Sequence, residues 1–423
     1  MSELDPAMNK LNSEKKHDED VVEWAYPEGK YPILLAYGFR PFFLIMPAYL
    51  SISILLWGLF WSGLLPLSFL NNPLEWHLYE MLFGATSAMM IGFILTAVPE
   101  LYEGEMPIVG NVLLGLLALW LVGRVSFWLI DWVGVYWVAI TNIPLILWVV
   151  VLVAKPIIQD PLRRQLSLAI LFLIVSAMQI WFFSIKLGWV NSDPMAVLKA
   201  SVGVFMVLVL LAARRVNMEA INHWLEQYNI DETYMARPPR YNVAIFSVTI
   251  YTVVEFFYPN NSALSWLALA AMAAILNTLN DFFLDEEPIF IRPFIWPLFS
   301  MLIMMAVGYG LIGWDYLMPE VYAINHFRHL LTLGSLGMAY FMVLVIVSHI
   351  HTGRDFIPNN WIGIGAFLIL LSSAIRGIAI PFVDGATSWG HMVSAIMWVL
   401  PFIGFLVIYG KWLKEPRVDG LPG

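Results

Sequence analysis

Long apolar segments follow one another along almost the whole chain of 423 residues. A helix needs about twenty mainly apolar residues to cross a bilayer. Only 13% of the residues are charged, against about 25% in soluble globular proteins. The sequence therefore predicts an all-α, polytopic membrane protein of about twelve transmembrane helices. The expected spans are 41–65, 75–99, 108–128, 133–154, 164–188, 195–216, 241–258, 263–284, 293–313, 322–350, 359–382 and 389–413.

Lys and Arg predict the orientation, because these residues accumulate in cytoplasmic loops. With the N-terminus inside, the inner segments hold nearly all Lys and Arg outside the spans, and the outer ends hold only Lys186. The polar N-terminal stretch lacks the apolar core of a signal peptide. We expect cytoplasmic tails over 1–38 and 414–423 around one transmembrane domain over 39–413, in a bacterial inner membrane. Connections are short, except for the polar stretch 217–240.

Ionisable residues inside the spans gather at one predicted depth. Charges within spans are costly and usually face a cavity, a partner or a cofactor. The outer ends of six spans are expected to collect four histidines and four cations: His77, His326, His329, His391, Arg124, Lys199, Arg328 and Arg376. Each could be an interfacial anchor, since long basic side chains snorkel. Anchors would be spread over both faces, however, so the set as a whole favours a binding site.

A b-type haem near the outer face fits this residue set. Cysteine is absent, which excludes thiolate-ligated haem and iron–sulfur clusters. Neutral imidazoles bind iron and copper, and arginines pair with carboxylates such as haem propionates. His326 and His329 lie three residues apart and share a helical face. The two histidines could ligate neighbouring metals, or one could ligate a metal while the other hydrogen-bonds to a metal ligand.

A second group ends the tenth predicted span. His349 and His351 lie two residues apart, on nearly opposite helical faces, and could address different groups. Arg214, Arg215 and His223 are candidates to lie close by. A structural role is as well supported here as a functional one, because inner span ends are normally basic.

Tyr79 and Glu80 follow His77 closely and are the candidates for carrying protons near a metal. Glu80 could instead pair with a nearby arginine. Short repeated strings, such as Phe205-Met-Val-Leu-Val-Leu and Phe341-Met-Val-Leu-Val-Ile, suggest a four-helix unit used three times. That arrangement would resemble the catalytic subunit of haem–copper oxidases, whose His-Pro-Glu-Val-Tyr motif is missing here.

Several motifs resemble the NnrS family of bacterial membrane proteins. They are Gly38-Phe39-Arg40-Pro41-Phe42-Phe43-Leu44, Trp76-His77-Leu78-Tyr79-Glu80-Met81-Leu82-Phe83-Gly84, Gly92-Phe93-Ile94-Leu95-Thr96-Ala97-Val98-Pro99, His329-Leu330-Leu331-Thr332-Leu333-Gly334 and His351-Thr352-Gly353-Arg354. The resemblance implies a haem- and copper-containing inner-membrane protein linked to nitric oxide and nitrosative stress. The family's invariant histidines would map onto His77, His329 and His351.

The chain departs from the family pattern at three points. The family usually reads His-x-His-Glu where this chain has His77-Leu78-Tyr79-Glu80, so that site is altered or Tyr79 substitutes for the second histidine. His349 stands where the family commonly has Leu and would be an additional ligand. His391 has no assigned place in the pattern.

The leading hypothesis is therefore a membrane haem–copper protein that handles nitric oxide, either as an oxidoreductase that reduces it to nitrous oxide with an unknown electron donor, or by binding it. His77 and His329 are the predicted haem ligands, and His326 and His391 the first copper candidates, with His349 and His351 as further metal candidates. Arg124, Arg328 and Arg376 would hold propionates, and Arg40 joins the cofactor-binding candidates. The alternatives are a transporter with a polar substrate path and a non-catalytic protein that delivers or senses haem or copper. Nothing indicates nucleic-acid binding.

Overall fold

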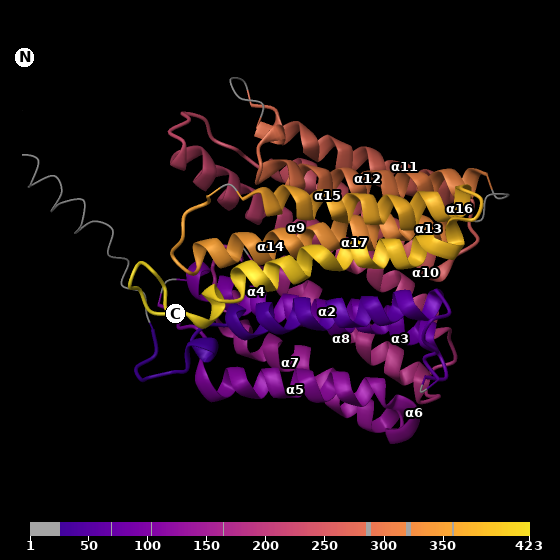
Figure 1. The fold of residues 1–423 in the computed structure, drawn as a ribbon, viewed down its shortest axis with the longest axis horizontal. Helices are drawn as coiled ribbons and strands as arrows, with labels where there is room; N and C mark the ends of the chain where they lie inside the picture. The colour runs from indigo at the N-terminus through magenta and orange to yellow at the C-terminus, as the bar shows by residue number, and fades with distance from the viewer. Residues whose placement is uncertain are drawn as a thin grey trace, which may run out of the picture.

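The computed structural model describes residues 26–68, 70–102, 104–163, 165–284, 289–318, 323–357 and 359–423. These residues form long helices that run side by side, with no strand among them (Figure 1). Eleven helical segments of the described chain are long and apolar enough to cross a membrane. The prediction of an all-α polytopic membrane protein is confirmed.

The spans follow the predicted order. The first six are α2 (Phe39–Trp61), the continuous run of α3 (Pro73–Tyr79), η2 (Glu80–Ala85) and α4 (Thr86–Leu101), then α5 (Gly110–Trp128), α7 (Val135–Gln159), α8 (Leu166–Lys186) and α9 (Pro194–Gln227). Short α6 (Ile130–Val133) joins α5 to α7.

The second half continues with α10 (Pro238–Phe257), α11 (Ala263–Thr278) with η3 (Leu279–Phe282), and α12 (Ile295–Leu317). Next come the run of α13 (Ile324–His329), η5 (Leu330–Leu336) and α14 (Gly337–Ile350), the run of α15 (Asn360–Ala374), η6 (Ile375–Ala379) and α16 (Ile380–Phe382), and α17 (Ala386–Tyr409). Besides η3, which is a 3-10 turn, three further short 3-10 turns are η1 (Ile33–Leu35), η4 (Ile289–Ile291) and η7 (Trp412–Lys414).

One predicted span and one predicted connection differ from the structure. The segment predicted as a span at 241–258 forms α10, a helix of 20 residues. It is not among the eleven helices that are long and apolar enough to cross a membrane. Its polar residues, which include Arg240 and Glu255, lower its apolar content. The polar stretch 217–240 is not a simple connection, because α9 continues through it to Gln227.

Side-chain caps begin several of these helices. Asn72 accepts a hydrogen bond from the Glu75 amide (3.1 Å), and Asp193 accepts one from the Met195 amide (2.9 Å). In both cases proline follows the cap as the first helical residue. A capping side chain followed by proline stabilises the first turn of a helix. The cap satisfies one free backbone amide, and proline has no amide hydrogen to leave unsatisfied.

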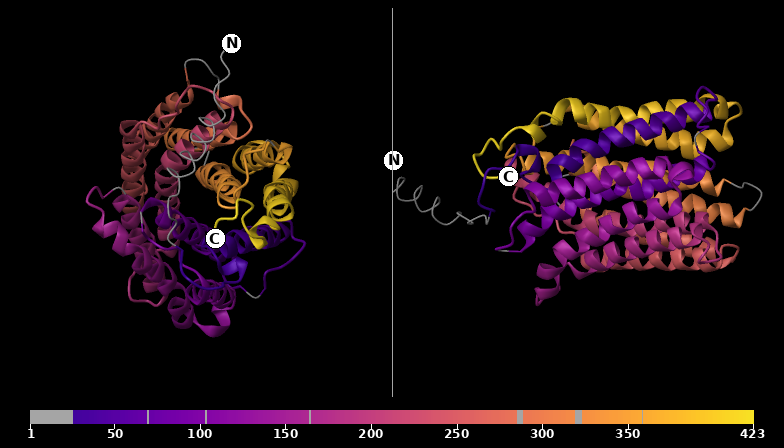
Figure 2. Two further views of the ribbon diagram at one scale, coloured as in Figure 1. Left: turned by 90° about the vertical axis from the view of Figure 1, so that its left-hand side faces the viewer. Right: turned by 90° about the horizontal axis from the view of Figure 1, so that it is seen from below.

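The spans of the second, sixth and tenth predicted helices form the centre of the bundle. Pro73–Leu101, Pro194–Gln227 and Ile324–Ile350 have the largest buried shares of the eleven, at 83%, 67% and 78%. Along the chain, these three spans follow one another at intervals of four predicted helices. This interval equals the four-helix unit that the repeated sequence segments suggested. The remaining spans surround them, as the view along the helices shows (Figure 2).

Both described chain ends lie at one end of the bundle, called here the terminal end. Arg40, at the start of α2, donates hydrogen bonds to the carbonyl oxygens of Leu413 (3.0 Å), Glu415 (2.8 Å) and Gly423 (2.6 Å). The opposite end, called the far end, carries α3, α6, α13 and α16 (Figure 1).

Candidate functional site

A cavity of about 430 Å³ opens at the far end between the three central spans. His77 from α3 and His329 from α13 both line it, together with Lys199 from α9 and Arg376 from η6. Its volume falls in the range of roughly 300–1,000 Å³ that is typical of ligand and cofactor sites. We call it the histidine cavity.

The His77 ring is held by an aromatic neighbour. It stacks on Trp57 of α2 with a centroid distance of 4.2 Å and an interplanar angle of 5°. The side chain is 8% exposed, and its Nδ1 atom is buried with no hydrogen-bond partner among the described residues. A buried imidazole nitrogen without a partner is unusual, because unpaired buried polar atoms cost free energy.

The His329 ring is oriented by its own helix. Its Nδ1 lies 2.9 Å from the carbonyl oxygen of Asn325. A carbonyl only accepts hydrogen bonds, so Nδ1 carries the hydrogen and the Nε2 lone pair of the neutral ring is left for a ligand. Metal-binding histidines are commonly oriented through their other nitrogen in this way.

Cations without carboxylate partners line the same cavity. Neither Arg376 nor Lys199 forms an ion pair with any other described residue, and the Arg376 guanidinium donates to Nδ1 of His326 (2.7 Å). Because arginine only donates, His326 must accept at Nδ1 and carry its hydrogen on Nε2. The cavity therefore combines two imidazoles, unpaired positive charge and the apolar side chains of Leu50, Ile54 and Leu82.

Arg328 also lines the cavity, but its charge is shared with a carboxylate. It donates two hydrogen bonds to Glu255 of α10, at 3.1 and 2.5 Å. Tyr251 (2.6 Å) and Tyr316 (3.2 Å) donate to the same carboxylate. Glu255 was not among the predicted site residues, although a carboxylate inside an apolar segment is itself a signal that a buried cation lies nearby.

Arg124 lies outside the cavity, in a second buried polar cluster. Its guanidinium donates to Glu80 at 2.5 Å and also to Asn142. Tyr49 donates to the same Glu80 oxygen, and Glu80 is completely buried. The pairing of Glu80 with an arginine, considered from the sequence, is what the structure has. A propionate-binding role for Arg124 would require this pair to open.

Tyr79 belongs to the Glu80 cluster and does not line the histidine cavity. It accepts a hydrogen bond from Gln179 (2.9 Å), donates one to Asn142 (3.2 Å) and stacks on Phe127 at 3.8 Å. Asn142 and Gln179 were not predicted as site residues. Polar amides within otherwise apolar helices were the available signal for them. The proton-carrying role of Tyr79 and Glu80 stays a prediction.

Side-chain copper ligation has less support than haem ligation. Among the described residues, no group of three or more His, Asp or Glu side chains is arranged to hold a metal ion. His326 already uses its Nδ1 lone pair on Arg376, whereas His391 stacks on Trp61 at 5.1 Å. The described donor set therefore fits a two-ligand group such as bis-histidine haem, and does not fit a copper ion with three side-chain ligands.

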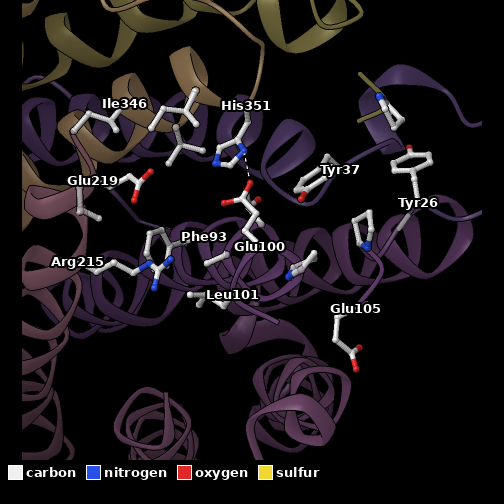
Figure 3. A pocket seen from close by; sticks show the side chains of 18 of the residues that line it. Tyr26, Tyr37, Phe93, Glu100, Leu101, Glu105, Arg215, Glu219, Ile346 and His351 are labelled. Carbon is white, nitrogen blue, oxygen red and sulfur yellow. Dashed lines mark ion pairs between the residues drawn. The ribbon is translucent and has the colours of Figure 1, made fainter. Parts of the chain in front are cut away.

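The terminal end contains a larger cavity of about 820 Å³ (Figure 3). There His351 pairs with Glu100 at 2.7 Å through Nδ1, and Arg215 and Glu219 line the same space. Tyr37 points into it with a hydroxyl that has no partner among the described residues. Burial raises the pKa of this hydroxyl, so it stays protonated and can donate.

His349 faces a different environment from His351. Its Nδ1 lies 2.8 Å from the Asp355 carbonyl oxygen, and its Nε2 is buried without a described partner. Phe294, Phe356 and Trp412 surround the ring, and His223 contacts the same Phe356. Arg40 also lies at the terminal end, bound to backbone carbonyls, and so apart from the histidine cavity.

Two comparisons with known proteins gave different results. The comparison with curated proteins found no match. The family model described as NnrS protein matches residues 33–417, nearly the whole chain and both histidine groups. The chain is therefore a multi-pass membrane protein that belongs to the NnrS family.

Proposed function

We propose that the histidine cavity binds one b-type haem between His77 and His329, and that the protein uses it to bind nitric oxide. The observation that carries the proposal is that these two imidazoles, on two different central spans, line one cofactor-sized cavity. Membership of a family linked to nitric oxide supports the ligand. When bound, a haem would supply an iron centre to which nitric oxide could bind in place of one of the two imidazoles.

The chain's own residues would perform the positioning. Trp57 holds the His77 ring by stacking, and the Asn325 carbonyl holds the His329 ring with Nε2 free. Arg376 and Lys199 would pair with the propionates, because they have no carboxylate partner among the described residues. The apolar walls would shield the imidazoles from bulk water.

We further propose that the protein reduces nitric oxide to nitrous oxide. Two nitric oxide molecules would take up two electrons and two protons and release nitrous oxide and water, so an external electron donor is required. Glu80 follows His77 by three residues, about one helical turn, and its side chain is completely buried. Copper at His326 and His391 would need Arg376 to release His326.

The test uses absorption spectra of the purified full chain. His77→Ala and His329→Ala should each lose the Soret band or convert it to the spectrum of a five-coordinate haem. His223→Ala is the matched control, since His223 packs against Phe356 at the terminal end and is not among the residues that line the histidine cavity. Spectra that are unchanged in both cavity variants would refute the assignment of the ligands.

A transport function is the second candidate, and one observation favours it. The bundle has a polar cavity at each end, lined by charged residues from the same central spans. Substrate-dependent flux in proteoliposomes made from haem-free protein would support transport. Absence of flux, with stoichiometric haem, would support the haem proposal.

A further inference from the structure

A third, smaller cavity lies at mid-depth between the two polar ones. Its volume is about 60 Å³, and it lies between α4, α9 and α14 with contributions from α8 and α12. The side chains that form its walls are mainly apolar and include Met89, Met90, Ala212, Met301 and Met342. We call it the apolar cavity.

The apolar cavity adjoins both polar cavities. Leu336 and Tyr340 line it and the histidine cavity alike. Phe93 and Val216 line it and the terminal-end cavity alike, and Phe93 is seen on the wall of the latter in Figure 3. The three cavities therefore follow one another along the central spans, from one end of the bundle to the other.

The chemistry of the walls decides what can occupy this space. A water molecule needs two to four polar partners to be held in a cavity, and an ion without partners pays a large desolvation cost. The hydroxyls of Thr86 and Tyr340 hydrogen-bond to each other and so offer little to a ligand. Asn217 contributes an amide, adjacent in sequence to Val216 at the terminal-end boundary. Small, uncharged and weakly polar molecules remain as occupants.

Tyr340 stands at the boundary with the histidine cavity. Its side chain is 5% exposed, and its bond to Thr86 links α14 to α4 across the passage. Both residues follow closely on π-helical segments, η2 ending at Ala85 and η5 at Leu336. The wider π turns therefore set the position of this partition, and π segments often occur at functional sites.

We propose that the apolar cavity binds small uncharged molecules of the size of nitric oxide and passes them between the terminal-end and histidine cavities, with the Tyr340–Thr86 pair as the partition. The inference rests on the proposed function only for the identity of the gas. A small molecule held there would lie next to the histidine cavity, where a reaction of two such molecules would need it.

Xenon is the probe, because it is uncharged, apolar and small. The full chain is labelled with ¹³C-methyl methionine, and methyl spectra are recorded under increasing xenon pressure. The Met89, Met90, Met301 and Met342 signals should shift and saturate, whereas that of exposed Met235 should shift only linearly. Linear shifts at all five methionines would overturn the inference.

Filling the cavity gives the matched variants. Ala212→Phe should abolish the saturable shifts, and Ala212→Leu should weaken xenon binding about tenfold, a loss that corresponds to roughly 1.4 kcal/mol. Ala273→Phe, on the exposed surface of α11, should leave the shifts unchanged. If Ala212→Phe does not fold, Ala212→Leu alone decides, and unaltered xenon affinity in it would overturn the inference.

The outcomes for the two proposals are separable. Protein that binds xenon at these methionines but holds no haem supports the apolar cavity and refutes the proposed function. Protein that holds haem but shows no saturable xenon shift refutes the apolar cavity alone. Where haem is present, Tyr340→Phe should raise the fraction of photolysed carbon monoxide that escapes from the haem pocket, and an unchanged fraction would contradict the partition role.

Discussion

At the scale of single residues, hydrogen-bond partners separate side chains that the sequence presents as equivalent. His329 donates to a carbonyl and keeps Nε2 free, whereas His326 accepts from Arg376. Both residues lie on one short helix. Residue spacing predicts that two histidines share a face, but it contains no information about which nitrogen is already in use.

The arginines show the same limit. Arg124, Arg328 and Arg376 were all predicted to hold propionates, and only Arg376 lacks a carboxylate partner among the described residues. Glu80 and Glu255, which neutralise the other two, lie far from them in sequence. Pairing across separate helices depends on tertiary packing, which a single sequence does not give.

The buried Glu80–Arg124 pair yields the first stability prediction. Glu80→Gln or Arg124→Gln should each lower the unfolding free energy by about 3–5 kcal/mol, because a buried charge loses its partner. The double variant should lose less than the sum. Lys411→Gln is the control, since both partners of the Lys411–Glu415 pair are exposed, and its loss should cost about 1 kcal/mol or less. Denaturant titration in mixed micelles measures all four, and additive losses would contradict the pairing.

At the scale of elements, π-helical turns interrupt three of the spans that line the histidine cavity. The segments η2, η5 and η6 interrupt the helices that carry His77, His329 and Arg376. Apolar periodicity predicted these spans to within a few residues. It could not predict the π turns, because the extra residue in a turn is stabilised by contacts with neighbouring helices and leaves no composition signal.

Gly84, inside η2, permits the close approach of the Glu80–Arg124 pair. A Cβ atom at this position would collide with Glu80 Oε2 and with an Arg124 nitrogen. Gly84→Ala should therefore destabilise the protein by at least about 2 kcal/mol, through strain and displacement of the pair. Gly363→Ala, in α15 with nothing within 4 Å of the added Cβ, should be neutral or stabilise by about 0.5–1 kcal/mol. Equal melting temperatures for the two variants would refute this account.

The C-terminal segment after α17 is fixed at the terminal end by polar contacts. Val418 donates its amide hydrogen to the Thr352 carbonyl (3.2 Å), and Arg417 binds Asp419 at 2.6 and 3.0 Å. The Arg417 hydrogen bonds hold the pKa of the Asp419 carboxyl below its usual range.

This depressed pKa predicts that the segment loosens in acid. A carboxyl with a lowered folded-state pKa stabilises the folded form above its ordinary value of about 3.9, and the contribution is lost as the pH falls below it. Below about pH 4, the segment should therefore open more often, and the protection of the Val418 amide against hydrogen exchange should fall. Asp419→Asn should remove that dependence and exchange faster at neutral pH, and wild-type protection that persists in acid would contradict the prediction.

At the scale of the whole molecule, the sequence was sufficient for the fold class, and it predicted about twelve spans where the described residues form eleven helices long and apolar enough to cross a membrane. Apolar length alone located the segments, and α10 shows where it reaches its limit, because Glu255 lowers the apolar content of a helix that still packs between α9 and α11. The cavities could not be predicted, since they are gaps between helices rather than properties of any one of them. The cytoplasmic position of both termini stays a prediction.

The haem content of the purified full chain tests the central proposal most directly. Iron and protohaem should each be present at one per chain, with a reduced-minus-oxidised spectrum of six-coordinate, low-spin haem b that changes when nitric oxide is added. A colourless protein that contains no iron, even after expression with added haem precursor, would contradict the proposal that His77 and His329 form a haem site.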